Sequence, residues 1–163
     1  MRVRIARDEL RRIRELSQTI KTLQREIAQL VARIAPQLLS EPGFGPLIAA
    51  KLVGEVAGAS RFASDAKLAR SAGIAPIPVS SGKTNRHRLD RGGNRQINAT
   101  IHRIAVTRLR CHPETQDYIA RKRAEGKSTK EAIRCLKRHL TRRLWHLLQP
   151  PNPGTGHPHP SIS

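Results

Sequence analysis

The segment IRELSQTIKTLQREIAQLVARI, residues 13–34, decides the first part of the fold. Its apolar side chains recur at alternating steps of three and four residues, and the residues between them are mostly polar. This spacing is an a/d heptad seam, which is typical of a coiled-coil helix. The alternative is a single amphipathic helix that docks on the chain's own domain. The seam consists of Ile13, Leu16, Ile20, Leu23, Ile27, Leu30 and Ile34.

The seam also predicts how the chain assembles. Ile occupies one heptad position and Leu the other, a pattern that favours a parallel pair of helices. No Asn or Lys interrupts the seam to fix its register, so antiparallel pairing stays open. We therefore expect a homo-oligomer that forms through an N-terminal coiled coil.

Downstream of this helix, the segment EPGFGPLIAAKL, residues 41–52, predicts a turn between a short helix and an apolar helix. The turn Gly43-Phe44-Gly45 resembles that of the helix-hairpin-helix motif. In that motif, glycines let backbone N–H groups approach a DNA phosphate at a helix N-terminus. The alternative is an ordinary helix–helix turn with a glycine C-cap.

The rest of the chain predicts further helices, so the expected fold class is all-α. Ser64 begins a short helix, and a third helix begins at Pro113. Between them, a long helix is expected from about Asn94 to Arg110, with Ile97, Ile101, Ile104 and Ala105 facing inward. The capping box Ser128-Thr129-Lys130-Glu131 opens a final helix with one apolar stripe. Its cationic residues, Lys137 among them, are expected to cover the other faces. We expect a coiled-coil helix over 1–40, a helical domain over 41–148 and a disordered tail over 149–163.

Charge indicates the partner of this chain. It has 31 Lys and Arg against 12 Asp and Glu, a formal net charge of +19, which is the electrostatic signature of a nucleic-acid-binding protein. Aromatic residues make up only 2%, which disfavours base stacking as the main mode of binding. No long apolar segment or signal peptide is present, so no membrane partner is expected. The two cysteines lie in no metal-ligand spacing and are expected to be free thiols in a reducing cytoplasm, near the nucleoid.

The segment PIPVSSGKTNRHRLDRGGNR, residues 76–95, carries the candidate chemistry. Two adjacent hydroxyls, Ser80 and Ser81, precede a glycine and a dense group of cations. An activated hydroxyl is a nucleophile, and Arg and Lys stabilise charge on a phosphate that is being transferred. The prolines exclude a helix at the start, so a loop or a short β-ribbon is expected. The alternative for the two serines is an ordinary pair of turn hydroxyls.

Four blocks in a fixed order carry a family resemblance. They are Pro42-Gly43-Phe44-Gly45, the block from Phe62 to Pro76, Ser80-Ser81-Gly82-Lys83, and the block from Arg91 to Ile97. On these blocks, Glu41 to Leu148 resembles the C-terminal transposase domain of the insertion-sequence one-ten family, also called one-sixteen and nine-oh-two. Full-length members have an N-terminal RNase H-like domain whose four carboxylates hold metal, followed by a coiled coil. Their serine attacks DNA, and a structured RNA guides target choice in characterised members.

The resemblance assigns roles to residues of this chain. It places the nucleophile at Ser81, with Ser80 as the alternative. It implies that Lys83, Arg86 and Arg88 neutralise the scissile phosphate, and that Arg91, Gly92 and Gly93 seat the next phosphate, beside Arg95. Asn98 stands where the family usually has Arg, which leaves one cationic contact in doubt. The partners implied are DNA and a guide RNA.

The acids of this chain are scattered, and no pair is spaced to hold two metal ions. We therefore expect no metal or other cofactor on this chain, and Mg²⁺ only with the N-terminal carboxylate domain. Because that domain is missing, we expect a truncated transposase fragment that binds DNA and is inactive alone, so whether it is an enzyme stays open. The alternative is a non-catalytic nucleic-acid-binding protein of the helix-hairpin-helix type.

Overall fold

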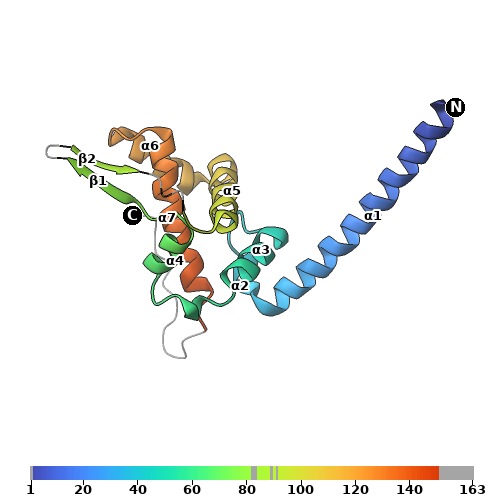
Figure 1. The fold of residues 1–163 in the computed structure, drawn as a ribbon, viewed down its shortest axis with the longest axis horizontal. Helices are drawn as coiled ribbons and strands as arrows, with labels where there is room; N and C mark the ends of the chain where they lie inside the picture. Colours follow the sequence, from blue (N-terminus) through green and yellow to red (C-terminus); the bar gives the residue numbers. More distant parts are fainter. Residues whose placement is uncertain (1, 82–83, 89, 91, 151–163) are drawn as a thin grey trace.

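The structure, a computed structural model, describes residues 2–81, 84–88, 90 and 92–150, without the side chains of residues 2, 79–81 and 84–88. The described chain is helical apart from one two-stranded antiparallel ribbon, which confirms the all-α prediction and the short ribbon expected after Pro76 (Figure 1). The elements are α1 (Arg2–Ile34), α2 (Pro36–Leu39), α3 (Pro46–Val56), the 3-10 turn η1 (Ala59–Arg61), α4 (Asp65–Ser71), β1 (Ile77–Ser81), β2 (Thr84–Arg88), α5 (Arg95–Cys111), α6 (Pro113–Ala124) and α7 (Thr129–Leu147).

Local capping signals set the starts of three helices. The Ser64 side chain accepts a hydrogen bond from the Lys67 N–H at the start of α4. At the start of α7, Ser128 and Glu131 form the complete capping box. Each side chain satisfies N–H groups that have no partner within the helix, which is why these starts were readable from the sequence. Asn94 caps α5 in the same way.

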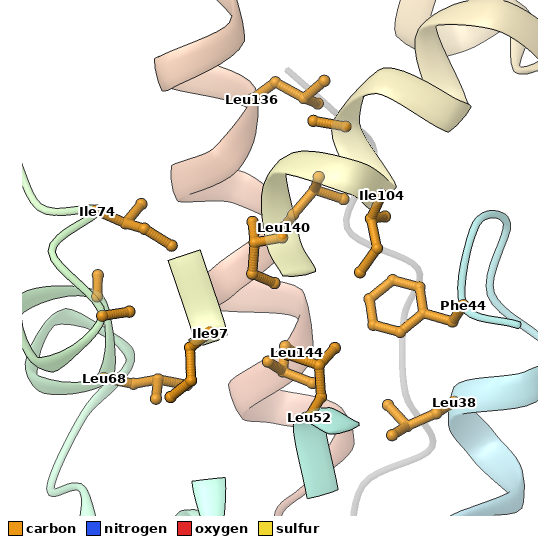
Figure 2. Packing of buried hydrophobic residues seen from close by; sticks show 14 of the residues in the cluster. Leu38, Phe44, Leu52, Leu68, Ile74, Ile97, Ile104, Leu136, Leu140 and Leu144 are labelled. Carbon is orange, nitrogen blue, oxygen red and sulfur yellow. The ribbon is translucent and has the colours of Figure 1, made fainter. Parts of the chain in front are cut away.

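The core is built around α5 and α7. Ile97, Ile101 and Ile104 of α5 are fully or almost fully buried, as the sequence predicted. Figure 2 shows side chains from several other elements gathered around Leu140 and Leu144 of α7. They come from segments far apart in the chain, so burying them joins the helices into one body. The core contributors include Leu38, Phe44, Leu52, Leu68, Ile97, Ile104, Leu136, Leu140 and Leu144.

Helix α1 projects from this body as a long arm (Figure 1). Only its last turns contribute to the core, where Val31 is buried and Ile27 packs partly against it. Farther out, the seam stays open to solvent: Ile20 is 54% exposed and Leu23 50% exposed. The alternative of a helix docked along its own domain is therefore wrong for the outer part of α1.

The ribbon projects from the body on the side away from α1 (Figure 1). Its register pairs Ile77 with Arg88 at the foot and Ser81 with Thr84 at the far end. Two glycines with positive φ hold the foot together: Gly73 has φ 64° and Gly93 has φ 87°. A Cβ added to Gly93 would lie 2.5 Å from the Gly73 nitrogen, so only glycine permits this approach. The foot is thereby fixed to the end of α4 and the start of α5.

One expectation about α7 is wrong. Lys137 was expected on the cationic outer face of this helix, but it is buried. It lies four residues after Ile133 and three before Leu140, so the helical repeat places it on the apolar face.

Candidate nucleic-acid interface

The ribbon places the two candidate nucleophiles together at its far end. Ser80 pairs with Asn85 and Ser81 with Thr84, while Arg86 and Arg88 lie on the opposite strand. Ser81 is four residues beyond Ile77, which corresponds to about 13 Å along a strand. Lys83 and Arg91 lie outside the described residues. The backbone therefore puts both serines and two of the candidate cations on one projecting element.

The two glycines of the helix-hairpin-helix-like turn have different surroundings. Gly43 has φ 82°, and a Cβ added to it would lie 3.2 Å from Ile104 Cγ2. Gly45 is the N-cap of α3, and a Cβ added there would meet nothing within 4 Å. The positive φ and the close packing of the turn against α5 therefore explain why position 43 is a glycine. Of the two glycines, Gly45 is the one with open space for an approaching group.

The N-terminus of α5 is already occupied by protein groups. Asn94 Oδ1 accepts hydrogen bonds from the Gln96 N–H at 2.8 Å and the Ile97 N–H at 3.1 Å. Its amide nitrogen donates to Glu55 Oε2 at 2.8 Å. A phosphate would have to compete with these partners for the N–H groups of Gln96 and Ile97. The close packing of Gly93 on Gly73 explains the glycine at position 93 without a ligand. Arg95, in contrast, is exposed on the first turn of α5.

A buried carboxylate ties the turn to α5 and α7. Glu41 Oε2 accepts a hydrogen bond from Arg108 Nη2 at 3.0 Å, and Glu41 Oε1 accepts one from Arg143 Nη2 at 2.6 Å. Arg108 Nε also donates to the Pro42 carbonyl at 2.7 Å. Burial raises the pKa of Glu41, but the two guanidinium groups outweigh it and hold the pKa below its usual value. Glu41 is thus a structural anchor between the turn, α5 and α7.

A second carboxylate joins α4 to α7. Asp65 Oδ2 lies 2.9 Å from Arg138 Nη1 and 3.1 Å from Arg142 Nε. Burial raises the pKa of Asp65, yet the two arginines lower it overall. Arg138 and Arg142 are therefore partly neutralised by the protein itself and are less available to a phosphate.

Asn98, the position at which the sequence resemblance implied an Arg, joins three parts of the structure. Its amide nitrogen donates to the Ala72 carbonyl at 2.9 Å and to the Gly73 carbonyl at 3.1 Å. Its Oδ1 accepts a hydrogen bond from Lys137 Nζ. An amide has both a donor and an acceptor, which this position uses and which an arginine does not offer.

A pocket of about 770 Å³ opens between the foot of the ribbon and helices α6 and α7. Pro76 and Asp90 line it on the ribbon side, and Tyr118 and Lys137 line it on the helix side. The sequence reasoning missed this pocket, although the placement of Lys137 within an apolar stripe was a signal that could have indicated it. Its size falls within the usual range for small-ligand sites.

Two further features of the described residues concern membranes and metals. No helix there is long and apolar enough to cross a membrane. In the same ranges, no group of three or more His, Cys, Asp or Glu side chains is arranged to hold a metal ion.

Comparison with known proteins identifies the family. The sequence model of the Transposase IS116/IS110/IS902 family matches residues 35–120. The chain is 34% identical over 119 residues to the 42 kDa protein of insertion element IS900 of Mycobacterium paratuberculosis, covering 72% of this chain and 30% of that protein. It is 32% identical over 138 residues to the 44.8 kDa protein of insertion element IS116 of Streptomyces clavuligerus, covering 83% of this chain and 32% of that protein.

A third relative, the 43.6 kDa protein of insertion element IS110 of Streptomyces coelicolor, is 34% identical over 117 residues, covering 71% of this chain and 29% of the relative. The matches thus span about a third or less of the length of each relative. All four sequence blocks lie within the matched region, and the paired serines of the third block belong to β1. On this match and these relatives, the chain belongs to the IS116/IS110/IS902 family of transposases.

Proposed function

We propose that this chain is a DNA-binding part of a transposase that presents Ser81 to a DNA phosphate. The observation that carries the proposal is the ribbon: in a chain of this family, β1 brings Ser80 and Ser81 to the end of a projecting element. The net charge of +19 supports a nucleic-acid partner.

The chemistry proposed is a phosphoryl transfer to a hydroxyl. Ser81 Oγ attacks the phosphorus of a backbone phosphate and forms a new O–P bond. The P–O bond to the adjoining nucleotide breaks, and its oxygen takes up the proton that the serine loses. Lys83, Arg86 and Arg88 would stabilise the charge that builds on the phosphate oxygens.

A two-stranded ribbon is also a suitable shape for duplex DNA. The major groove is wide enough to admit such a ribbon, and its phosphates lie along both edges. Arg86 and Arg88 both belong to β2, so one strand of the ribbon carries both cations. This arrangement favours contacts of the β2 edge of the ribbon with DNA phosphates, and such contacts do not depend on the base sequence.

DNA binding that depends strongly on salt is the first expected result. Replacing both Arg86 and Arg88 with Gln should lower the magnitude of the slope of log affinity against log salt by about two, because each phosphate contact contributes about 0.9. Fluorescence anisotropy of a labelled duplex, titrated at several salt concentrations, measures the slope.

The matched control is a chain with Arg110→Gln and Arg123→Gln, two exposed arginines of α5 and α6. It removes the same charge but should change the slope by less than half as much. No measurable binding of the unaltered chain to DNA at low salt would overturn the proposed function. If both double variants changed the salt slope equally, the ribbon would not be part of the DNA interface.

We also propose that two chains pair through the exposed seam of α1. The seam residues of the outer arm have no covering partner within the described chain, and Ile and Leu alternate in the pattern of a parallel pair. Pairing would bring two Ser81 ribbons into one particle, which an exchange between two DNA strands requires.

Light scattering behind a sizing column tests the pairing. At tens of micromolar and moderate salt, the mass should be twice the 18.2 kDa of one chain. Ile20→Glu places a charge in the seam and should give the single-chain mass, whereas Gln18→Glu, on the opposite face of the helix, should not. A single-chain mass for the unaltered protein, unchanged by added DNA, would contradict the proposal.

Several finer expectations belong to this proposal. A guide RNA and Mg²⁺ would enter with the N-terminal carboxylate domain that full-length relatives are expected to supply. We further propose that the chain divides into an arm over 1–40, a helical unit over 41–148 and a tail over 149–163. Val31, Ala35 and Leu38 of the arm nevertheless belong to the core of the helical unit. A location in the cytoplasm near the nucleoid follows from the expected DNA partner.

A further inference from the structure

The pocket beside the ribbon foot contains buried polar groups that the protein leaves incompletely bonded. Lys137 is 9% exposed and Tyr118 is 2% exposed, and both line the pocket. Lys137 Nζ donates to Asn98 Oδ1, a neutral acceptor. Tyr118 Oη has no hydrogen-bond partner within the described part of the chain. Burying a cation and a hydroxyl in this way costs folding free energy, so both groups point to a function.

The acids that line the pocket do not compensate Lys137. Three carboxylates belong to the lining, namely Asp90, Glu125 and Glu131. Each already has another partner in the structure. These partners are the Gly92 N–H and Arg70 for Asp90, Lys122 and Lys127 for Glu125, and Ser128 for Glu131.

The lining also contains other Lys and Arg residues, among them Arg134. Among the described residues, neither Arg134 nor Lys137 lies within ion-pair distance of a carboxylate. Burial lowers the pKa of Lys137, and the charge of Arg134 lowers it further. Burial also raises the pKa of Tyr118 to about 12, so its hydroxyl keeps its proton at neutral pH and remains a donor. The lining therefore includes two cations that have no carboxylate within ion-pair distance among the described residues, and one hydroxyl donor without a partner there.

We propose that this pocket binds a backbone phosphate of the DNA strand that reaches the ribbon, with Lys137 Nζ and Tyr118 Oη as its donors. The inference rests on the proposed DNA binding and assigns it a second anchoring point. The ribbon starts at the rim of the pocket, since Pro76 and Asp90 line it. Ser81 lies about 13 Å farther along β1, roughly the rise of four nucleotides of a DNA strand. The pocket would thus hold the strand a few nucleotides from the phosphate presented to Ser81.

The test replaces Lys137 with glutamine, which keeps a donor for Asn98 and removes the charge. We expect Lys137→Gln to bind a labelled DNA duplex about tenfold more weakly and to lower the magnitude of the salt slope by about one. Lys130→Gln is the matched control, because Lys130 lies on the same helix, is exposed and does not line the pocket. It should change the affinity less than twofold.

Stability separates a lost ligand contact from a damaged fold. Because Lys137→Gln removes a buried charge, its unfolding temperature should equal or exceed that of the unaltered chain. Tyr118→Phe is the second variant: it keeps the ring and all charges and should weaken DNA binding severalfold without lowering the unfolding temperature. Unaltered DNA affinity and salt slope in both variants would overturn the assignment.

Inorganic phosphate distinguishes the source of the ligand. If the pocket serves DNA, phosphate at millimolar concentration should compete only weakly with the duplex. If the unaltered chain binds no DNA, the proposed function fails. In that case, a rise in unfolding temperature with phosphate that Lys137→Gln abolishes would assign the pocket to a free anion and overturn the DNA source. The absence of both effects would overturn the pocket as an anion site altogether.

Discussion

A chain carrying Ser81→Ala is expected to form no covalent adduct with DNA under conditions in which the unaltered chain does. The hydroxyl oxygen is the only atom of that side chain able to form a bond to phosphorus, and alanine removes it. The assay combines the chain with the N-terminal domain of a full-length relative, Mg²⁺, guide RNA and DNA that carries the ends of the element. The adduct is detected as labelled DNA that migrates with the protein on a denaturing gel.

Two controls locate the nucleophile. Ser60→Ala removes an exposed hydroxyl on η1, away from the ribbon, and should leave the adduct unchanged. Ser80→Ala should reduce the adduct less than Ser81→Ala does. If only Ser80→Ala abolished the adduct, the nucleophile would be Ser80 instead of Ser81. A wild-type level of adduct in Ser81→Ala would refute it and favour a binding module without chemistry.

Replacing Glu41 with glutamine is expected to produce the largest loss of stability. The side chains of Glu41 and Arg108 are only 11% and 7% exposed, and Arg143 completes the cluster. Glutamine keeps the shape but leaves two guanidinium groups facing each other without a counter-charge. Breaking a buried ion pair from one side costs about 3 kcal/mol or more, which for a chain of this size lowers the unfolding temperature by about 6–12 °C. Circular dichroism during heating measures this change.

The effect should also depend on pH. The pKa of Glu41 in the folded chain is held below its ordinary value, so its stabilisation is fully present above about pH 4.5 and is lost as the pH falls through the folded value. The difference in unfolding temperature between the unaltered chain and Glu41→Gln should therefore shrink as the pH falls from about 4.5 through the lowered pKa of Glu41. A difference that is constant over this range would contradict an ionised Glu41 as the cause.

Glu125 provides the matched control for this prediction. It also holds two cations, Lys122 and Lys127, at 2.9 and 2.8 Å, and these hold its pKa at about 2. The group is exposed, however, so solvent and salt screen the interaction. Glu125→Gln should leave the unfolding temperature nearly unchanged. Because both carboxylates have two cationic partners, this result would show that burial, and not the number of ion pairs, causes the loss of stability in Glu41→Gln.

Features that depend on neighbouring residues were predictable from the sequence. The heptad spacing from Ile13 to Ile34 gave α1, and the capping box at Ser128 gave the start of α7. The apolar positions Ile97, Ile101 and Ile104 are buried as predicted. Helical periodicity and caps act over three or four residues, so the sequence alone contains their geometry. The paired serines and the cations around them are contiguous in the chain, so the sequence alone could propose them as a site, and their role stays a prediction.

Features that depend on contacts between distant segments were decided by the tertiary structure. Glu41 meets Arg143, which lies 102 positions away, and Asn98 meets Lys137 across 39 positions. The close approach of Gly73 and Gly93 fixes the ribbon foot, and no local sequence pattern predicts this approach. Burial changes what such groups do: the same carboxylate or ammonium that is nearly neutral to stability in water becomes an anchor, or an unsatisfied charge, once water is removed. The sequence alone therefore determined the helices and the family of this chain, whereas the three-dimensional packing decided which charges hold it together and which have no carboxylate partner among the described residues.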